Sequence, residues 1–153
     1  MARPQANLSI IECGPQDIGS LTPLFDAYRR FYKEDQDLAG AKRFLLERLS
    51  KKESRIFLAK EGAACLGFVQ LYPSFSSTAM KRLWILNDLF VAPAARRRGV
   101  AQALMERAKS LAVETGAEGL ILETAVDNHD AQRVYERLGW KRDEKFHRYS
   151  LDV

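Results

Sequence analysis

Segment 96–98 consists of three arginines that directly precede Gly99, where the sequence predicts the start of a helix. A helix N-terminus carries about half a positive charge, so cations there are unfavourable unless an anion binds as well. The first helical turn also has backbone N–H groups without intrahelical acceptors, to which a phosphate can bind. Gly99 lets the backbone approach such an anion closely, and the small Ala101 keeps the second turn open. The spacing predicts a polyanion site; the alternative is three solvated arginines that happen to precede a helix.

Polar side chains interrupt two apolar segments that have the pattern of strands. Asn87 and Asp88 lie within segment 82–92, and Glu123 lies within segment 119–126, although such residues are depleted in strands. Neighbouring strand residues face opposite sides, so Asn87 and Asp88 can point into one site only if the strand has a bulge. Asp88 is the leading candidate for a general base, with Asn87 and Glu123 beside it. For each carboxylate the alternative is a structural role.

The elements that must position these residues follow from hydrophobic periodicity. The predicted strands are 8–12, 55–60, 63–72, 82–92, 119–126 and 146–151, and the predicted helices are 15–32, a segment around 41–49, 99–114 and 129–138. Pro23 predicts either a kink in the first helix or a restart with Thr22 as its cap. Pro73 predicts the end of a strand, followed by a loop. Hairpins early and a strand–helix–strand order later predict an α/β protein with a mixed sheet.

Composition limits the classes of protein that need to be considered. The 153 residues predict a single domain, and neither a membrane-spanning run nor the apolar core of a signal peptide is present, so we expect a cytoplasmic protein. The net charge of +4 is interspersed with acidic residues, which does not favour a nucleic-acid partner. Cys13 and Cys65 are too few for a disulfide framework and are expected to be buried thiols, and neither His129 nor His147 has a metal-spaced partner.

Segment 96–101, with the sequence RRRGVA, resembles the Arg/Gln-x-x-Gly-x-Gly/Ala signature of the GCN5-related N-acetyltransferase (GNAT) superfamily. The blocks LNDLFVAP, RRRGVAQALMERA and LILETAVDNHDAQRVYERLGW also occur in the order that this family has. The resemblance implies one N-acetyltransferase domain over residues 1–153. It also implies a mixed, mostly antiparallel sheet that splays between its fourth and fifth strands and is flanked by four helices.

The resemblance further implies acetyl-CoA as co-substrate and no metal. Backbone groups of the segment from Arg97 to Gln102 would bind its pyrophosphate, and amides of the segment from Leu89 to Val91 would lie against the pantetheine arm and the acetyl carbonyl. The cofactor-binding residues implied in this way are Leu89, Phe90, Val91, Arg96, Arg97, Arg98, Gly99, Val100, Ala101, Gln102, Asn128, Ala131 and Tyr135.

Acetyl transfer to an amine requires two proton transfers. An alkylammonium with a pKa of about 10.4 lies about 4.6 kcal/mol from its nucleophilic form at pH 7, so a base must accept its proton. The departing thiolate benefits from a donor that is still protonated at pH 7, and a tyrosine is such a donor. Tyr135 stands where the resembling family usually has this general acid; the alternative is that it packs its helix against the sheet.

The acceptor site is implied by the same resemblance. Tyr28 and Tyr32 lie on the first helical segment, which often lines the acceptor pocket in this superfamily, although core packing is their alternative. The stretch LNDLFV resembles diamine acetyltransferases, in which a glutamate stands at the position of Asn87. Because an amide is not basic near neutral pH, Asn87 makes a polyamine acceptor doubtful. The stretch also resembles acetyltransferases of histones and of amino acids.

The function expected from these features is transfer of an acetyl group from acetyl-CoA to a primary amine by direct attack in a ternary complex. The acceptor would be a small amine, an amino acid or a lysine side chain, and the resemblance favours a homodimer without a membrane partner. Two other classes stay open at this point. One is a non-catalytic acyl-CoA sensor with the same fold, and the other is a small basic nucleic-acid binder that uses segment 96–98.

Overall fold

The computed structural model describes residues 7–153, and their contacts divide the chain into two units, Met1–Leu122 and Glu123–Val153. The elements of the first unit are β1 (Leu8–Glu12), α1 (Ile18–Phe31), α2 (Leu38–Ser50), β2 (Arg55–Glu61), β3 (Ala64–Ser76), β4 (Lys81–Val91), α3 (Val100–Glu114) and β5 (Gly119–Ile121). The second unit contains α4 (His129–Arg137). The expectation that residues 1–153 form a single domain stays a prediction.

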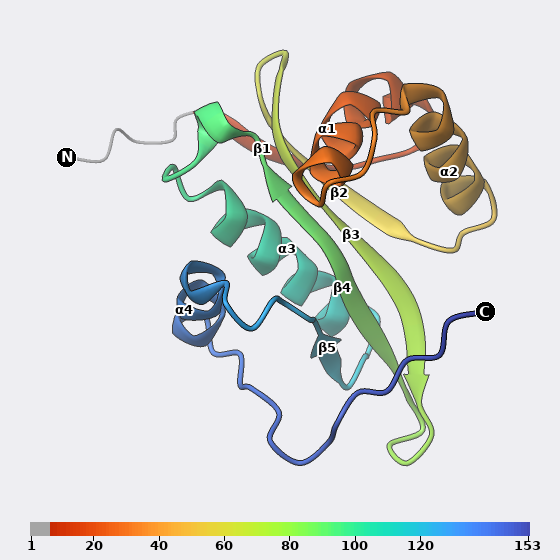
Figure 1. Ribbon diagram of the computed structural model, residues 1–153, viewed down its shortest axis with the longest axis vertical. Coiled ribbons are helices and arrows are strands. Elements are labelled where there is room, and N and C mark those ends of the chain that lie inside the picture. Colours follow the sequence, from red (N-terminus) through yellow and green to blue (C-terminus); the bar gives the residue numbers. More distant parts are fainter. Residues whose placement is uncertain (1–6) are drawn as a thin grey trace. The chain divides into compact units, whose positions relative to one another are not determined.

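The first unit is built on a five-stranded sheet in the order β1-β2-β3-β4-β5. β1 to β4 pair antiparallel, and β5 pairs parallel to β4. In Figure 1, α1 and α2 lie on one side of this sheet and α3 lies on the other. The predicted α/β class with a mixed, mostly antiparallel sheet is therefore confirmed.

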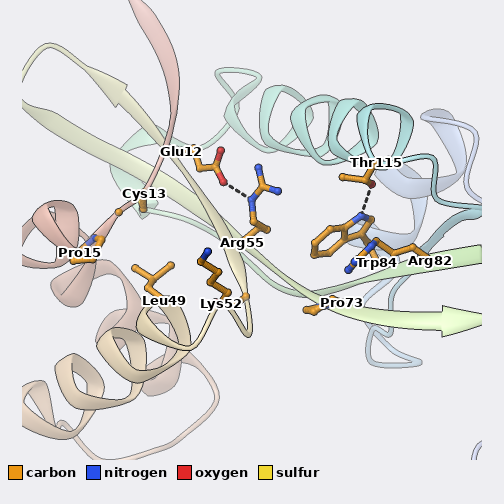
Figure 2. Close-up of a pocket in the computed structure, with 12 residues that line it drawn as sticks. Glu12, Cys13, Pro15, Leu49, Lys52, Arg55, Pro73, Arg82, Trp84 and Thr115 are labelled. Atoms are coloured by element: carbon orange, nitrogen blue, oxygen red, sulfur yellow. Dashed lines mark hydrogen bonds and ion pairs between the residues drawn. The ribbon is translucent and has the colours of Figure 1, made fainter.

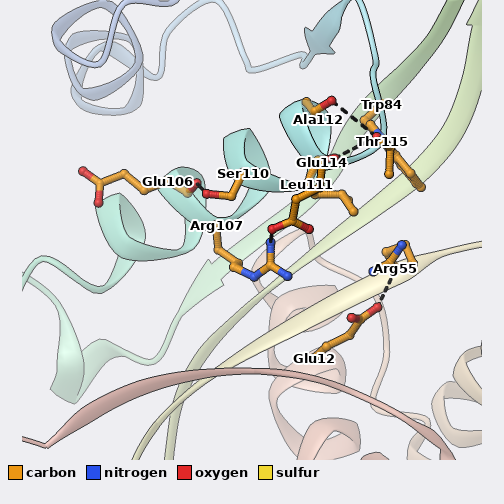
Figure 3. A network of polar contacts seen from close by, with 10 residues as sticks. All are labelled: Glu12, Arg55, Trp84, Glu106, Arg107, Ser110, Leu111, Ala112, Glu114 and Thr115. Carbon is orange, nitrogen blue, oxygen red and sulfur yellow. Dashed lines mark hydrogen bonds and ion pairs between the residues drawn. The ribbon is translucent and has the colours of Figure 1, made fainter.

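Each face of the sheet has its own apolar contacts. Toward α1 and α2, side chains of the helices such as Leu21, Phe25 and Leu45 pack with Ile56 and Phe68 of the sheet in one buried cluster. On the α3 side, the guanidinium of Arg107 lies 4.3 Å from the centre of the Phe57 ring and pairs with Glu114 (Figure 3). Because β2 and β3 are covered on both faces there, each contains a continuous run of buried residues, 56–59 and 66–71, rather than an alternating pattern.

The proline at position 73 does not end its strand, contrary to the prediction. Pro73 lies inside β3 and pairs with Trp84 of β4. The ladder between β3 and β2 stops at Leu71, opposite Arg55. β3 is therefore an edge strand on that side, where a residue without an N–H group is tolerated. The predicted loop shortens to the turn at 77–80.

The proline at position 23 does not restart its helix either. α1 runs through Pro23 from Ile18 to Phe31, and the Thr22 hydroxyl donates to the Ile18 carbonyl at 2.7 Å instead of capping a new helix. Leu21 and Phe25 are buried on the two sides of the proline. Their packing holds the helix together where one backbone hydrogen bond is lost.

Two C-terminal expectations are wrong. β5 is only three residues long, so 122–126 does not continue it, and 146–151 is not a strand within the described part of the chain. Segment 146–151 pairs with no strand in the ladders that residues 7–153 form, and Phe146, Tyr149 and Leu151 are exposed. Of the two free cysteines, Cys13 is buried as expected and Cys65 is half-buried.

Candidate active site

A β-bulge at Asn87 reverses the faces of the sheet to which the side chains in the second half of β4 point. Gln70 of β3 pairs with Asp88, whereas the next residue, Leu71, pairs with Leu86, so Asn87 is left without a cross-strand partner. The consequence can be followed on the side chains. The Trp84 indole bonds to Thr115 at the end of α3, but the Phe90 ring, six positions on, lies against α1. Without the bulge, residues 84 and 90 would share a face.

The bulge brings Asp88 to the α1 face and keeps Asn87 beside it. The Asn87 side-chain amide donates to Asp88 Oδ1 at 3.0 Å, and the Gln70 Nε2 donates to Asp88 Oδ2 at 2.5 Å. The Tyr28 hydroxyl supplies a third hydrogen bond. Asp88 is only 4% exposed. Asn87 and Asp88 were expected to share one site only if the strand had a bulge, and this bulge is present.

Burial controls the protonation of this cluster. Burial raises the pKa of Asp88 above its ordinary value, and the hydrogen bonds from Gln70, Tyr28 and Asn87 oppose that rise only in part. Burial and the nearby Asp88 carboxylate also raise the pKa of Tyr28 and bring that of Tyr72 to about 12. At neutral pH both tyrosines are therefore hydrogen-bond donors next to a carboxylate with raised basicity.

An aromatic wall connects the cluster to solvent. Tyr28 packs against Phe25, Phe68 and Phe90 at ring-centre distances of 6.3, 5.8 and 6.2 Å, so its ring belongs to the core while its hydroxyl bonds to Asp88. Tyr32, directly after α1, stacks edge-on with Tyr28 at 5.1 Å and is 59% exposed. Core packing thus accounts for the Tyr28 ring but not for Tyr32.

The arginines of segment 96–98 differ from one another. Arg96 Nε donates to the Val91 carbonyl at 3.2 Å, and its guanidinium lies about 6 Å from the ring centres of Phe31 and Phe90. Arg98 forms an ion pair with Glu61 at the end of β2. Two of the three cations therefore have protein partners. These partners lower the electrostatic cost of placing arginines at a helix N-terminus.

The backbone after Arg96 has the unbonded donors that an anion site requires. Arg97 and Gly99 both have left-handed backbone angles, with φ of 62° and 76°. The first helical hydrogen bond of α3 runs from the Ala103 amide to the Gly99 carbonyl at 3.0 Å. Within residues 7–153, none of the amides from Arg97 to Gln102 makes a hydrogen bond of good geometry. These free N–H groups at a helix N-terminus can bind a phosphate.

The edge of β4 is open next to this segment. The parallel ladder between β4 and β5 contains three residue pairs and stops where Ile85 faces Ile121. From Leu86 to Val91, β4 pairs only with β3 in the ladders that residues 7–153 form. Backbone groups of Leu89, Phe90 and Val91 thus lie on the part of β4 that does not pair with β5, where the resemblance implies the pantetheine arm.

The second unit carries the remaining candidates. Asn128 caps α4, where its Oδ1 accepts from the Ala131 amide at 3.3 Å. The Tyr135 ring lies 6.3 Å from that of Trp140. Glu123 is exposed and forms an ion pair with Arg148. The expectation of Glu123 inside a buried apolar strand is wrong because β5 ends at Ile121.

Gln70 and Tyr72 were missed as candidates for the site. The signal was nonetheless present, since Gln70 interrupts the apolar run GFVQLY just as Asp88 interrupts LNDLFV. A polar residue in each of two paired strands can be a matched pair, but the pairing register is needed to see it. The bulge at Asn87 sets that register.

The first unit thus combines an α/β fold with unbonded amides at a helix N-terminus, an unpaired strand edge and a buried carboxylate. Residues 21–140 match the family model described as Acetyltransferase (GNAT) family. The chain belongs to this family, and it is an acetyl-transferring enzyme.

The similarity to individual proteins extends over nearly the whole chain. The uncharacterized N-acetyltransferase YhfO of Bacillus subtilis is 44% identical over 146 residues, which cover 95% of this chain and 98% of the relative. A probable acetyltransferase of Haemophilus influenzae is 32% identical over 138 residues, 90% and 92% of the two chains. A solved probable acetyltransferase has a TM-score of 0.90 and 45% identity, with 95% and 97% covered. These relatives do not favour a non-catalytic sensor.

No helix within residues 7–153 is long and apolar enough to cross a membrane. The same part of the chain has no group of three or more side chains suited to hold a metal ion.

Proposed function

We propose that the protein transfers the acetyl group of acetyl-CoA to a primary amine by direct attack in a ternary complex. The observation that carries this proposal is the buried Asp88 carboxylate, whose pKa is raised, beside the open edge of β4. A carboxylate of raised basicity is suited to accept the proton that an alkylammonium must lose before it can attack. Acceptors within the proposal are a small amine, an amino acid or a lysine side chain.

The co-substrate would be held mainly by backbone groups. Amides of the segment from Arg97 to Gln102, beside Arg96, would bind the pyrophosphate, and those of Leu89, Phe90 and Val91 would bind the pantetheine arm and the acetyl carbonyl. Asn128, Ala131 and Tyr135 complete the proposed contacts. An aminoglycoside N-acetyltransferase solved with CoA shares the fold at a TM-score of 0.80 and 19% identity, which supports CoA as a ligand of this fold.

The proposed reaction makes one bond and breaks one. The amine nitrogen bonds to the thioester carbonyl carbon, the carbon–sulfur bond breaks, and CoA leaves as a thiolate. Asp88 accepts the proton from the amine, directly or through water, with Glu123 as the second candidate carboxylate. Tyr135 donates a proton to the thiolate.

The acceptor would bind between the carboxylate and the aromatic wall. Asp88 and Asn87 would receive the amine, and Tyr28 and Tyr32 would contact its carbon chain. Among relatives, N-alpha-acetyltransferase 30 of Homo sapiens is 32% identical over 96 residues, and a D-amino-acid N-acetyltransferase of Saccharomyces cerevisiae is 31% identical over 83 residues. Their names support an amine acceptor. We extend the proposal to a homodimer on the family resemblance alone, and the cytoplasmic location expected from the sequence stays a prediction.

The test is isothermal titration of acetyl-CoA and desulfo-CoA into the wild type and Gly99→Glu. Glutamate at this position places a negative charge in the proposed pyrophosphate site, so binding should be lost. Gly116→Glu is the matched control, because Gly116 also has a positive φ, of 66°, and open space around it, at the other end of α3. It should bind like the wild type. A wild type that binds neither ligand would overturn the proposal.

A wild type that binds acetyl-CoA would then be tested for turnover. Release of free CoA thiol is measured over a panel of small amines, amino acids and lysine-containing peptides. Thiol release that depends on one class of amine identifies the acceptor. Binding of acetyl-CoA without turnover on any member of the panel would contradict the catalytic part of the proposal.

A further inference from the structure

A cleft lies in the first unit, at the end of the sheet where β2 and β4 begin. Its volume is about 700 Å³. We call it the basic cleft and define it by Glu12, Lys52, Ser54, Arg55, Arg82 and Trp84. Figure 2 shows Lys52 at the end of α2, Arg55 at the start of β2, and Arg82 and Trp84 on β4 around the same space.

The basic cleft is separate from the proposed acetyl-CoA site. Along β4, Trp84 lies four positions before Asp88, which corresponds to about 13 Å of extended strand, and six positions before Phe90, which corresponds to about 20 Å. The length of α3 also separates the two sites, because the free amides lie at its N-terminal end while Thr115, one residue past its other end, lines the cleft. A helix of this length measures about 22 Å. A ligand in the basic cleft therefore occupies a different site from acetyl-CoA.

The lining of the cleft has an excess of positive charge. Arg55 is neutralised by an ion pair with Glu12. Lys52 and Arg82 form no ion pair with any of the residues 7–153. The C-terminus of α2 attracts a cation and so accounts for Lys52, but no helix end accounts for Arg82. Its guanidinium is held over the rings of Trp84 and Phe75 at 5.3 and 5.2 Å.

A buried hydroxyl at the same cleft has no protein partner. Ser54 is only 4% exposed, and its Oγ makes no hydrogen bond with any residue that the structure describes. Buried polar atoms are nearly always hydrogen-bonded, so an exception needs a reason. A hydroxyl that lines a cleft with unpaired cations can donate to an anion that these cations attract.

The floor of the cleft is rigid. The Trp84 indole N–H donates to the Thr115 hydroxyl at 2.9 Å, and that hydroxyl donates in turn to the Leu111 carbonyl at 2.7 Å (Figure 3). Trp84 is 4% exposed and cannot rotate without breaking this chain. The cleft thus combines a fixed aromatic floor with a serine hydroxyl and unpaired cations, as small-molecule sites do.

We propose that the basic cleft is a second ligand site, which binds a small organic anion through a phosphate or carboxylate group. Lys52 and Arg82 supply the positive charge, the Ser54 hydroxyl donates to an anionic oxygen of the ligand, and Trp84 contacts the rest of the ligand. A cleft of about 700 Å³ lies within the usual range for small-molecule sites. The site is independent of the acetyl transfer proposed above.

The test is a titration with inorganic phosphate and, separately, with citrate at constant ionic strength. The full chain is first saturated with desulfo-CoA, so that the free amides before α3 cannot contribute. The readout is the indole N–H signal of Trp84 in ¹H–¹⁵N spectra, assigned with Trp84→Phe. We expect a saturable shift, and the probe that binds more tightly identifies phosphate or carboxylate as the preferred group.

Two substitutions connect the shift to the site. Ser54→Ala removes a hydroxyl that bonds to nothing in the described protein, so it should keep the unfolding temperature and raise the Kd of the anion about tenfold. Lys52→Asn should raise that Kd similarly, and asparagine tolerates the positive φ of 55° at this position. Lys109→Gln, an exposed lysine on α3 outside the cleft, is the control and should bind like the wild type.

Three results would overturn the proposal. The first is no saturable shift with either probe up to about 10 mM, since binding weaker than this is not specific. The second is a shift of unchanged Kd in both Ser54→Ala and Lys52→Asn. The third is a response seen only without desulfo-CoA, which would place the anion at the free amides of α3.

Discussion

Gln70 and Asp88 face each other across β3 and β4, and Gln70 donates its side-chain N–H to the Asp88 carboxylate at 2.5 Å. Both side chains are buried, with exposures of 0% and 4%. Gln70 Oε1 has no hydrogen-bond partner among the described residues. The pair therefore joins a buried carboxylate to an amide whose oxygen is buried without a partner among these residues.

Replacement of Asp88 by asparagine should remove the base. Asparagine keeps the size of the side chain and can accept from Gln70, but it cannot take a proton at neutral pH. General acid–base catalysis contributes about 10²- to 10⁴-fold, so kcat/KM for the amine should fall by that factor in Asp88→Asn. Binding of acetyl-CoA, measured by titration, should stay unchanged.

Asn87→Ala is the comparison for this measurement. It removes one donor to the same carboxylate, at the edge of the cluster, and leaves the base in place. Its kcat/KM should fall far less than that of Asp88→Asn. Equal losses in both variants would mean that the hydrogen-bonded cluster, and not the carboxylate itself, supports the reaction.

The same carboxylate should make stability depend on pH. Burial raises the pKa of Asp88 above its unfolded value of about 3.9. Between the two pKa values the native protein binds more protons than the unfolded chain, so the unfolding free energy falls as pH rises. Asp88→Asn does not titrate here. Its unfolding temperature relative to the wild type should therefore increase from about pH 4 to pH 7.

Thermal unfolding of both proteins across this pH range is the measurement, with Asp35→Asn as the control because Asp35 is exposed. The control should follow the wild type. A difference between Asp88→Asn and the wild type that decreases toward pH 7 would show that the hydrogen bonds to Asp88 outweigh its burial.

Tyr28 should set the pH at which the base becomes active. Its hydroxyl bonds to the Asp88 carboxylate and holds the pKa of that carboxyl down. Tyr28→Phe keeps the ring contacts with Phe25 and Phe68 but loses this bond. The acidic limb of the kcat/KM profile should move to higher pH by about one unit. Tyr32→Phe should not move it, and a shift of equal size in both variants would contradict the assignment.

The sequence predicted the elements that depend on local pattern and missed those that depend on neighbours. α3 and β4 follow from periodicity, and both lie within one residue of the expected bounds. Pro73 was misjudged because its tolerance depends on where β2 begins opposite β3, and a local window of sequence does not show this pairing. Segment 146–151 contains the apolar residues Phe146, Tyr149 and Leu151, but a short apolar segment does not by itself supply a partner strand.

In the candidate site too, residues with a local signal were predicted and those that depend on distant neighbours were not. Asp88 and the amides before α3 were found because a carboxylate in an apolar strand and a glycine before a helix are local signals. The protein partners of Arg96 and Arg98 lie on α1, β4 and β2 and could not be read from segment 96–98. Gln70 needed the register across the bulge. Long-range pairing thus decides which polar residues belong to the cluster.

The hydrogen bond between Trp84 and Thr115 should hold the end of α3 to β4. The indole N–H donates to the Thr115 hydroxyl at 2.9 Å, and Trp84 is 4% exposed. Thr115→Val keeps the shape of the side chain and leaves the N–H buried without an acceptor. The unfolding free energy should fall by about 1–3 kcal/mol. Urea unfolding measures this loss.

Thr115→Ser separates the hydroxyl from the methyl group. Serine retains the acceptor for the indole and the donor to the Leu111 carbonyl, so it should recover most of the stability that Thr115→Val loses. If Thr115→Ser were destabilised and Thr115→Val were not, the methyl packing at this position would carry the stability and the hydrogen bond would not. If neither were destabilised, the end of α3 would be held by its apolar contacts with the sheet.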